Sequence, residues 1–90
     1  MKQLDLHGKN SFESEVLINL FLKEAFINKE YFICIIHGHG TMVLLRKTRE
    51  ILRDSKFVKS YEFAPQNYGG TGATIVYIKG EIDEKKKYDE

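Results

Sequence analysis

Two short segments join histidine to glycine and contain the residue types needed for acid–base chemistry or anion binding. Residues 4–8 read LDLHG, and residues 36–41 read IHGHGT. On a strand, Asp5 and His7 would share one face with their Cα atoms about 6.5–7 Å apart, so both could reach one phosphate group. A histidine exchanges protons near neutral pH. The pair therefore predicts an acid–base centre, and His37 is a further candidate for it.

The second segment has the composition of a phosphate-binding loop. Gly38 and Gly40 would let the backbone approach a phosphate closely because neither carries a Cβ atom. We expect Thr41 to cap a following helix and to donate a hydrogen bond to a phosphate oxygen. His39 is expected to point to solvent or to phosphate.

Other interpretations of these residues stay open. Asp5 and His7 could form a polar strand face, and His37 could be a strand-end residue bonded to the backbone. Zinc has suitable ligands in the group Asp5, His7, His37 and His39. The helical His-x-x-x-His spacing is absent, however, so we expect no metal site. Cys34 lies inside an apolar strand and is not expected to act as a nucleophile.

The chain alternates strand and helix patterns. Strands are expected at residues 2–7, 31–36, 58–63 and 73–78, with helices at 12–27 and 42–54. Asn10 or Ser11 could cap the first helix, and Glu13 completes a partial capping box with Asn10. That helix is apolar over more than one face, so we expect the fold to enclose it, with a protein partner as the alternative. Val43, Leu44, Ile51 and Leu52 are expected on the inner side of the second helix.

This β-α-β-α-β-β order predicts a two-layer α/β sandwich with a mixed, mostly parallel four-stranded sheet and two helices. The first three strands would then end at one edge of the sheet. Both helices would begin at that edge, where their free N–H groups favour an anion. Loops far apart in the sequence are therefore expected to converge on one ligand site.

Length and composition indicate one small domain. The chain has 90 residues and a net charge of +1, with 42% hydrophobic and 30% charged residues. We expect the domain to span residues 1–79, followed by a charged, flexible tail at 80–90. The longest apolar run, Tyr31–Ile36, is too short to cross a membrane. A single cysteine and no signal-peptide pattern favour a cytoplasmic location.

Basic residues gather in the second half of the chain although the net charge is small. Six of them fall between positions 46 and 59, namely Arg46, Lys47, Arg49, Arg53, Lys56 and Lys59. They could form a solvated helix face or a surface that binds phosphates. Arg46 and Lys47, next to the predicted phosphate loop, are the candidates for contact with nucleic acid.

Three motifs together resemble the small MutS-related (Smr) domain family. They are LDLHG at residues 4–8, IIHGHGT at 35–41 and GGTGATIV at 69–76, and the resemblance covers about residues 3–78. It implies a compact α/β sandwich that occurs alone or at the C-terminus of the second class of bacterial MutS proteins. Family members are endonucleases that nick DNA or cleave RNA, and some act on messenger RNA at stalled or collided ribosomes.

Carried over by position, the resemblance implies three catalytic residues, Asp5, His7 and His37. It also implies that Gly8, Gly38, Gly40, Gly69, Gly70 and Gly72 belong to the family's motifs at the binding edge. Together with the phosphate-loop and basic-helix arguments above, the predicted phosphate- and nucleic-acid-binding residues are Gly8, Gly38, His39, Gly40, Thr41, Arg46, Lys47, Gly69, Gly70 and Gly72. Two positions depart from the family pattern. Met42 stands where many members have a third glycine, and Leu45 stands where a basic residue is common, a charge that Arg46 could replace.

The expected function is therefore an endonuclease acting on RNA or DNA. RNA cleavage could proceed without metal, whereas DNA cleavage would need water and a divalent cation. One alternative is a non-catalytic module that binds nucleic acid or the ribosome. Another is a protein-interaction or dimerisation domain that uses the first helix. The expected partners are nucleic acid, the ribosome and the rest of a MutS-like parent chain, with no membrane.

Overall fold

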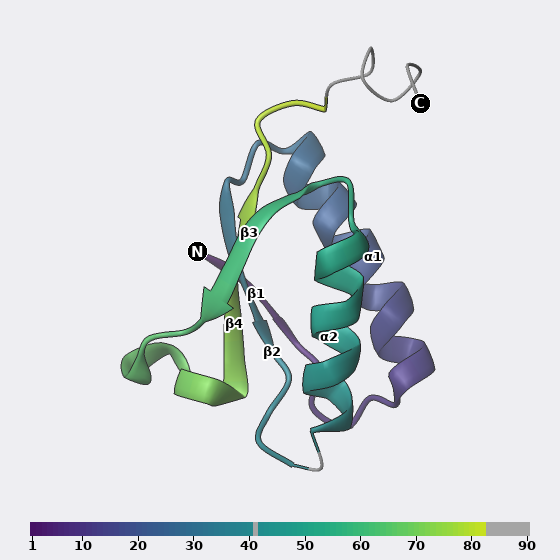
Figure 1. Cartoon of the computed structure of the whole chain (residues 1–90), viewed down its shortest axis with the longest axis vertical. Coiled ribbons are helices and arrows are strands. Elements are labelled where there is room, and N and C mark those ends of the chain that lie inside the picture. Colours follow the sequence, from purple (N-terminus) through teal and green to yellow (C-terminus); the bar gives the residue numbers. More distant parts are fainter. Residues whose placement is uncertain (41, 83–90) are drawn as a thin grey trace.

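A four-stranded mixed sheet forms one layer of the molecule (Figure 1). The computed structural model describes residues 1–40 and 42–82. The strands are β1 (Lys2–Asp5), β2 (Phe32–Ile36), β3 (Val58–Phe63) and β4 (Ala73–Ile78), arranged in the order β1-β2-β4-β3. β1 pairs with β2 in parallel, and β4 is antiparallel to both β2 and β3. Three strands therefore run in one direction, as expected, although only one pair is parallel because β4 inserts between β2 and β3.

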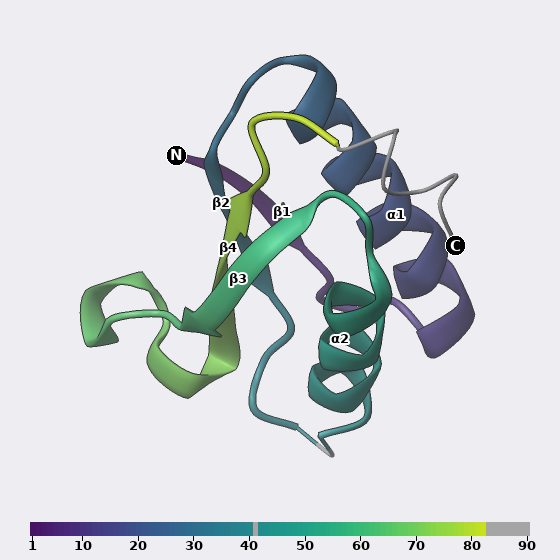
Figure 2. The same cartoon turned by 45° about the horizontal axis from the view of Figure 1, so that its top comes forward.

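Helices α1 (Ser11–Ile27) and α2 (Val43–Asp54) form the second layer, on one face of the sheet (Figures 1 and 2). Both crossover connections step across the sheet in the same direction, so right-handed crossovers place both helices on the same side. The main core lies between the layers and includes fully buried Leu6, Ile18, Leu22, Ile35 and Val76. The predicted α/β sandwich is confirmed.

The start of α1 follows the capping-box prediction. The Asn10 side chain accepts a hydrogen bond from Glu13 N at 2.8 Å, and Glu13 Oε1 accepts one from Asn10 N at 3.2 Å. Asn10 is therefore the N-cap, and the helix begins at Ser11, one residue earlier than expected. An N-cap of this kind typically contributes about 1 kcal/mol.

The expectation that the fold encloses α1 is wrong. Phe12, Val16 and Leu20 are 74%, 48% and 53% exposed and follow one another at four-residue intervals. The opposite side of the helix carries Ile18 and Leu22 into the core. A two-layer fold covers only the sheet-facing side of a helix, so this apolar stripe lies on the surface.

The start of α2 differs from the prediction. Its N-cap is Met42 and not Thr41, which lies outside the described residues. Met42 has φ 68° and makes no side-chain cap. Val43 was expected to face inward but is 51% exposed, because it lies in the first turn at the rim of the fold. Thr48, Ile51 and Leu52 are the buried residues of α2.

Smaller differences concern the loops. β1 ends at Asp5, two residues earlier than expected, and the loop before β4 contains two 3-10 turns, Gln66–Tyr68 and Gly70–Gly72. Most of the predicted C-terminal tail, residues 83–90, lies outside the described residues. Among the helices of the described part, none is long and apolar enough to span a membrane.

Candidate functional site

Three loops meet at the edge of the sheet where β1 and β2 end and β4 begins. Leu6 N donates a hydrogen bond to Ile36 O at 2.9 Å and so joins the first loop to the second. His37 N and Gly38 N both donate to Gly72 O, at 3.0 and 2.8 Å, and so join the second loop to the third. The predicted convergence of the three glycine-containing loops is confirmed.

The first loop presents His7 to solvent. Asp5 Oδ1 accepts a hydrogen bond from His7 N at 2.9 Å, and Lys9 N donates to Leu6 O across a tight turn. Gly8 occupies the turn with φ 76°, a value that favours glycine. The Asp5 carboxylate thus holds the backbone of His7, not its ring. The ring is exposed and makes no hydrogen bond with any described residue.

His37 has the opposite environment, since it is only 7% exposed and both ring nitrogens are engaged. Nδ1 lies 3.1 Å from Gly38 O, and Nε2 lies 2.9 Å from Thr74 Oγ1. A carbonyl oxygen only accepts, so Nδ1 carries the proton and Thr74 donates to Nε2. Burial lowers the pKa of His37, nearby Arg49 and His39 lower it further, and the bond to Gly38 partly opposes them. The ring is therefore neutral at pH 7.

His39 packs against the third loop. Its Nε2 lies 3.1 Å from Thr71 Oγ1. Its ring also covers Gly72 so closely that a Cβ atom at Gly72 would lie 2.6 Å from His39 Cε1. The glycine at position 72 is therefore needed for the approach of this ring.

A cleft of about 420 Å³ lies beside these loops, between the starts of the two helices. It is lined by Lys9, Asn10 and Ser11 from the α1 side, by His37, Gly38 and Gly40, and by Met42, Val43, Leu44 and Leu45 from α2. The N-terminus of α1 is capped by Asn10, and the carboxylate of Glu13 in its first turn offsets the positive end of the helix dipole. The N-terminus of α2 has no side-chain cap and no acidic residue in its first turn. Its positive dipole end is thus the more suitable one for an anion.

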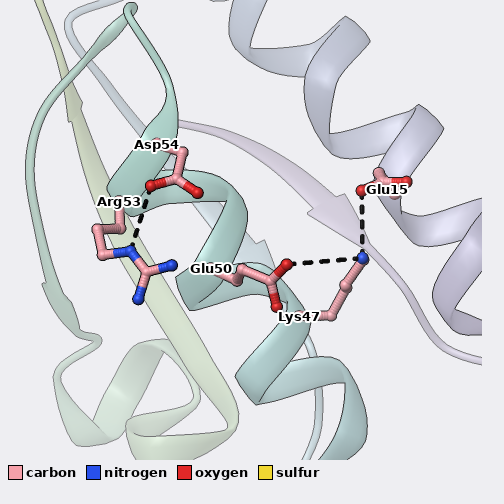
Figure 3. Close-up of polar contacts among 5 residues, drawn as sticks. All are labelled: Glu15, Lys47, Glu50, Arg53 and Asp54. Carbon is pink, nitrogen blue, oxygen red and sulfur yellow. Dashed lines mark hydrogen bonds and ion pairs between the residues drawn. The ribbon is translucent and has the colours of Figure 1, made fainter.

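The other predicted binding residues have different surroundings. Gly69 and Gly70 shape the third loop with φ values of 113° and 55°. Arg46 is exposed and lines a separate groove on α2. Lys47 Nζ lies 3.1 Å from Glu15 of α1 and 4.0 Å from Glu50, so it faces the other helix (Figure 3). Thr41 lies outside the described residues.

No cluster of three or more histidine, cysteine or acidic side chains suited to a metal ion occurs in residues 1–40 and 42–82. Cys34 is fully buried within the sheet. Burial raises the pKa of its thiol, so it is poorly suited to act as a nucleophile.

Sequence reasoning missed the two threonines that hold the histidines, Thr71 and Thr74. Thr74 pairs with Ile35 across β2 and β4, which places it beside His37 two residues further on. The insertion of β4 next to β2 creates this contact. Only a correct strand order, and no local motif, could have revealed it.

The fold and site together define a class: a small two-layer α/β domain with a glycine-rich edge suited to an anion. The family model of the Smr domain matches residues 4–79. The chain therefore belongs to the Smr domain family, and the resemblance drawn from the three motifs is confirmed.

Similar curated proteins include two named Endonuclease MutS2. The one from Carboxydothermus hydrogenoformans is 43% identical over 77 residues, and the one from Streptococcus pneumoniae (strain Taiwan19F-14) is 44% identical over 78. The matches cover 86% and 87% of this chain but only 10% of each relative. The chain thus spans about a tenth of the length of these relatives.

Two crystal structures share the fold. The Smr domain of Thermus thermophilus MutS2 matches with a TM-score of 0.85 and 34% identity, covering 88% of this chain and 99% of that one. YdaL, a stand-alone small MutS-related protein from Escherichia coli, matches with a TM-score of 0.78 and 24% identity, over 86% of this chain and 63% of that one. The second likeness supports the fold alone.

Proposed function

We propose that this domain is an endonuclease that cleaves phosphodiester bonds of nucleic acid. The observation that carries the proposal is the exposed ring of His7, which has no hydrogen-bond partner among the described residues. It lies two residues before Lys9, which lines the cleft that the α2 N-terminus faces. A free imidazole beside an anion-binding cleft is suited to proton transfer at a phosphate. The names of the MutS2 relatives agree with nuclease activity.

The cleft would hold the phosphate. Backbone N–H groups in the first turn of α2 and the ammonium group of Lys9 would stabilise the charge that develops on the phosphorus oxygens. A Cβ atom built at Gly38 or Gly40 meets no atom within 4 Å among the described residues beyond its chain neighbours, so the surface there is open to a ligand. Gly38 also has φ 81°, which another residue would adopt only with strain.

On RNA, His7 would take the proton of the 2′-hydroxyl group. The 2′ oxygen then attacks phosphorus, the bond to the 5′ oxygen breaks, and solvent protonates the leaving oxygen, which yields a 2′,3′-cyclic phosphate. Asp5 positions His7 through its backbone. His37, with both nitrogens engaged, positions the second and third loops and does not need to exchange a proton.

On DNA, no internal nucleophile exists. Water would have to attack the phosphate, and a divalent cation bound by the Asp5 carboxylate and the substrate would be needed to activate it. The products distinguish the routes, since hydrolysis leaves no cyclic phosphate.

The experiment that tests this proposal incubates end-labelled RNA and DNA of one sequence with the protein, with and without EDTA. The parent is compared with His7→Ala and with Lys23→Ala, an exposed charge-removal control on α1. We expect RNA cleavage that persists in EDTA, is lost in His7→Ala and is unchanged in Lys23→Ala. Equal cleavage by the parent and His7→Ala would remove His7 from the mechanism.

A second candidate function is a binding module without chemistry. The observation that favours it is the apolar lining of the cleft at Met42 and at residues 43–45, because these side chains supply no acid or base for catalysis. This function predicts salt-dependent binding of nucleic acid without any turnover. The ribosome and the rest of a MutS-like parent chain stay predicted partners in either case.

A further inference from the structure

We propose that a second surface on α2 and β3 binds the single-stranded nucleic acid that flanks the cleaved bond. We call it the arginine groove, and its residues are Arg46, Arg49, Arg53, Tyr61 and Phe63. The proposal deepens the proposed endonuclease function and rests on it for the link to cleavage. The contacts that form the groove lie on α2 and β3, away from the three loops.

The three arginines lie on one side of α2. They are spaced three and four residues apart, so their side chains project in nearly the same direction. Arg46, Arg49 and Arg53 line a groove of about 340 Å³ together with Leu45, Glu50 and Tyr61. Lys47 is directed away from this side, toward Glu15 of α1 (Figure 3). The basic residues of α2 therefore form two groups. Lys47 forms an ion pair with α1, and the three arginines line the groove.

Arg49 is held in place by aromatic rings. Its guanidinium carbon lies 4.3 Å from the ring centroid of Phe63 and 5.5 Å from that of Tyr61. Arg49 Nε is buried and has no hydrogen-bond partner in the part of the chain that the structure describes. Phe63 is still 42% exposed. A fixed guanidinium group next to an accessible aromatic ring is a combination that binds phosphate and stacks on a base.

The charges in the groove leave it able to bind an anion. Arg53 pairs with Asp54 at 3.2 Å, but the two side chains are 67% and 69% exposed. Such exposed pairs contribute little and can be displaced by a phosphate. Glu50, the one acidic residue lining the groove, is also within 4.0 Å of Lys47. Arginines therefore outnumber carboxylates along the groove.

The groove adjoins the proposed cleavage site. Leu45 lines both the cleft and the groove. Phe63 pairs with Thr74 across β3 and β4, and Thr74 bonds His37. Arg46 and Arg53 are seven positions apart, which corresponds to about 10.5 Å along the helix axis. This length corresponds to about three nucleotides at the roughly 3.4 Å per nucleotide of a stacked strand. One strand could thus occupy both sites.

Stacking on Phe63 requires a base whose face is free, and so the groove should prefer a single strand over a duplex. Base pairs within a duplex already stack on their neighbours and offer only their phosphates. The duplex would lose the contribution of the ring while keeping that of the arginines.

The test measures binding of a fluorescein-labelled twelve-nucleotide RNA and of the matched duplex by anisotropy over a range of salt concentrations. The variants are Arg46→Gln/Arg53→Gln, which changes two exposed side chains, Phe63→Leu, and the control Lys23→Gln. We expect the double variant to weaken single-strand binding roughly 10- to 100-fold at low salt. The salt slope should fall by about 1.4, which corresponds to 0.7 for each lost phosphate contact. Phe63→Leu should weaken single-strand binding at least about 5-fold and duplex binding much less.

The proposal is overturned if both groove variants bind the single strand like the parent and Lys23→Gln. It is also overturned if the duplex binds as tightly as the single strand and Phe63→Leu weakens both equally. Cleavage measured in parallel separates the two proposals. If the parent binds through the groove but does not cleave, the endonuclease proposal is rejected and the groove proposal stands. If the groove variants bind and cleave like the parent, the groove proposal is rejected and the endonuclease proposal stands.

Discussion

The two histidine–glycine segments have similar sequences but contrasting environments. His7 is exposed, and its ring has no hydrogen-bond partner in the described part of the chain. His37 is buried, and its two ring nitrogens contact Gly38 and Thr74. The ring of the first histidine is accessible to solvent, whereas the ring of the second joins the loop after β2 to β4.

The difference comes from strand position. β1 is an edge strand, so the loop that follows it has a neighbour on only one side. β2 lies between β1 and β4, so the loop that follows it is enclosed by both. His37, after the central strand β2, is therefore packed between neighbouring segments, whereas His7, after the edge strand β1, is accessible to solvent.

The largest effect on stability is expected at His37. His37→Ala should lower the free energy of unfolding by about 2–4 kcal/mol, because it leaves Thr74 without its partner and opens a cavity. His7→Ala should change it by less than about 0.5 kcal/mol, as surface substitutions usually do. Urea denaturation of both variants measures the contrast. Equal losses in the two variants would erase the distinction drawn between the histidines.

A smaller loss is expected at Gly72. Gly72→Ala would place a Cβ atom 2.6 Å from His39 Cε1, so the ring must move and its contact with Thr71 must break. We expect a cost of about 1–3 kcal/mol. A double-mutant cycle with His39→Ala tests the cause, since the substitution at position 72 should cost much less once the ring is removed. An unchanged cost would assign the effect to the backbone.

The strained start of α2 predicts a gain. Met42 has φ 68°, which costs a non-glycine residue about 1–2 kcal/mol. Met42→Gly should therefore raise the free energy of unfolding by about 1 kcal/mol, after the entropy that glycine loses on folding. Val43→Gly, one residue further into the helix, should instead lower it by a similar amount. A loss of stability in both variants would show that the Met42 side chain contributes more than the strain costs.

The smallest effect is a pH dependence. Because burial lowers the pKa of His37 in the folded state, the unfolded chain binds its proton more readily. The free energy of unfolding should therefore fall as the pH drops below the ordinary histidine value near 6.5, down to the lowered value. Denaturation midpoints across this range should show a shallower slope for His37→Gln than for the parent. The same slope in both proteins would assign the effect to other groups.

The sequence predicted the elements well because each has a clear local pattern. β3 and β4 match the expected ranges, and the Asn10–Glu13 capping box is present. The prediction for the start of α2 was wrong because no local sequence pattern indicates a methionine in the left-handed region. The surface position of Phe12, Val16 and Leu20 could not be read from the sequence either, since it depends on how much of the helix the sheet can cover.

The site was predictable in its location but not in its chemistry. Topology alone placed the glycine-containing loops at one edge. The environments of the three histidines depend on tertiary contacts, with Thr71 and Thr74 more than thirty positions away. The same holds for the stacking of Arg49 on Phe63, which joins a helix to a strand.

The most direct test of the central claim is chemical rescue of the two histidine positions. Single-turnover cleavage of RNA should fall about 10²- to 10⁴-fold in His7→Ala. Added imidazole should raise the cleavage rate of His7→Ala at least about 10-fold, because the space left by the removed ring is open to solvent. His37→Ala, measured under conditions where it is folded, should gain nothing from imidazole. Rescue of His37→Ala without rescue of His7→Ala would contradict the account and make the buried histidine the proton-transfer group.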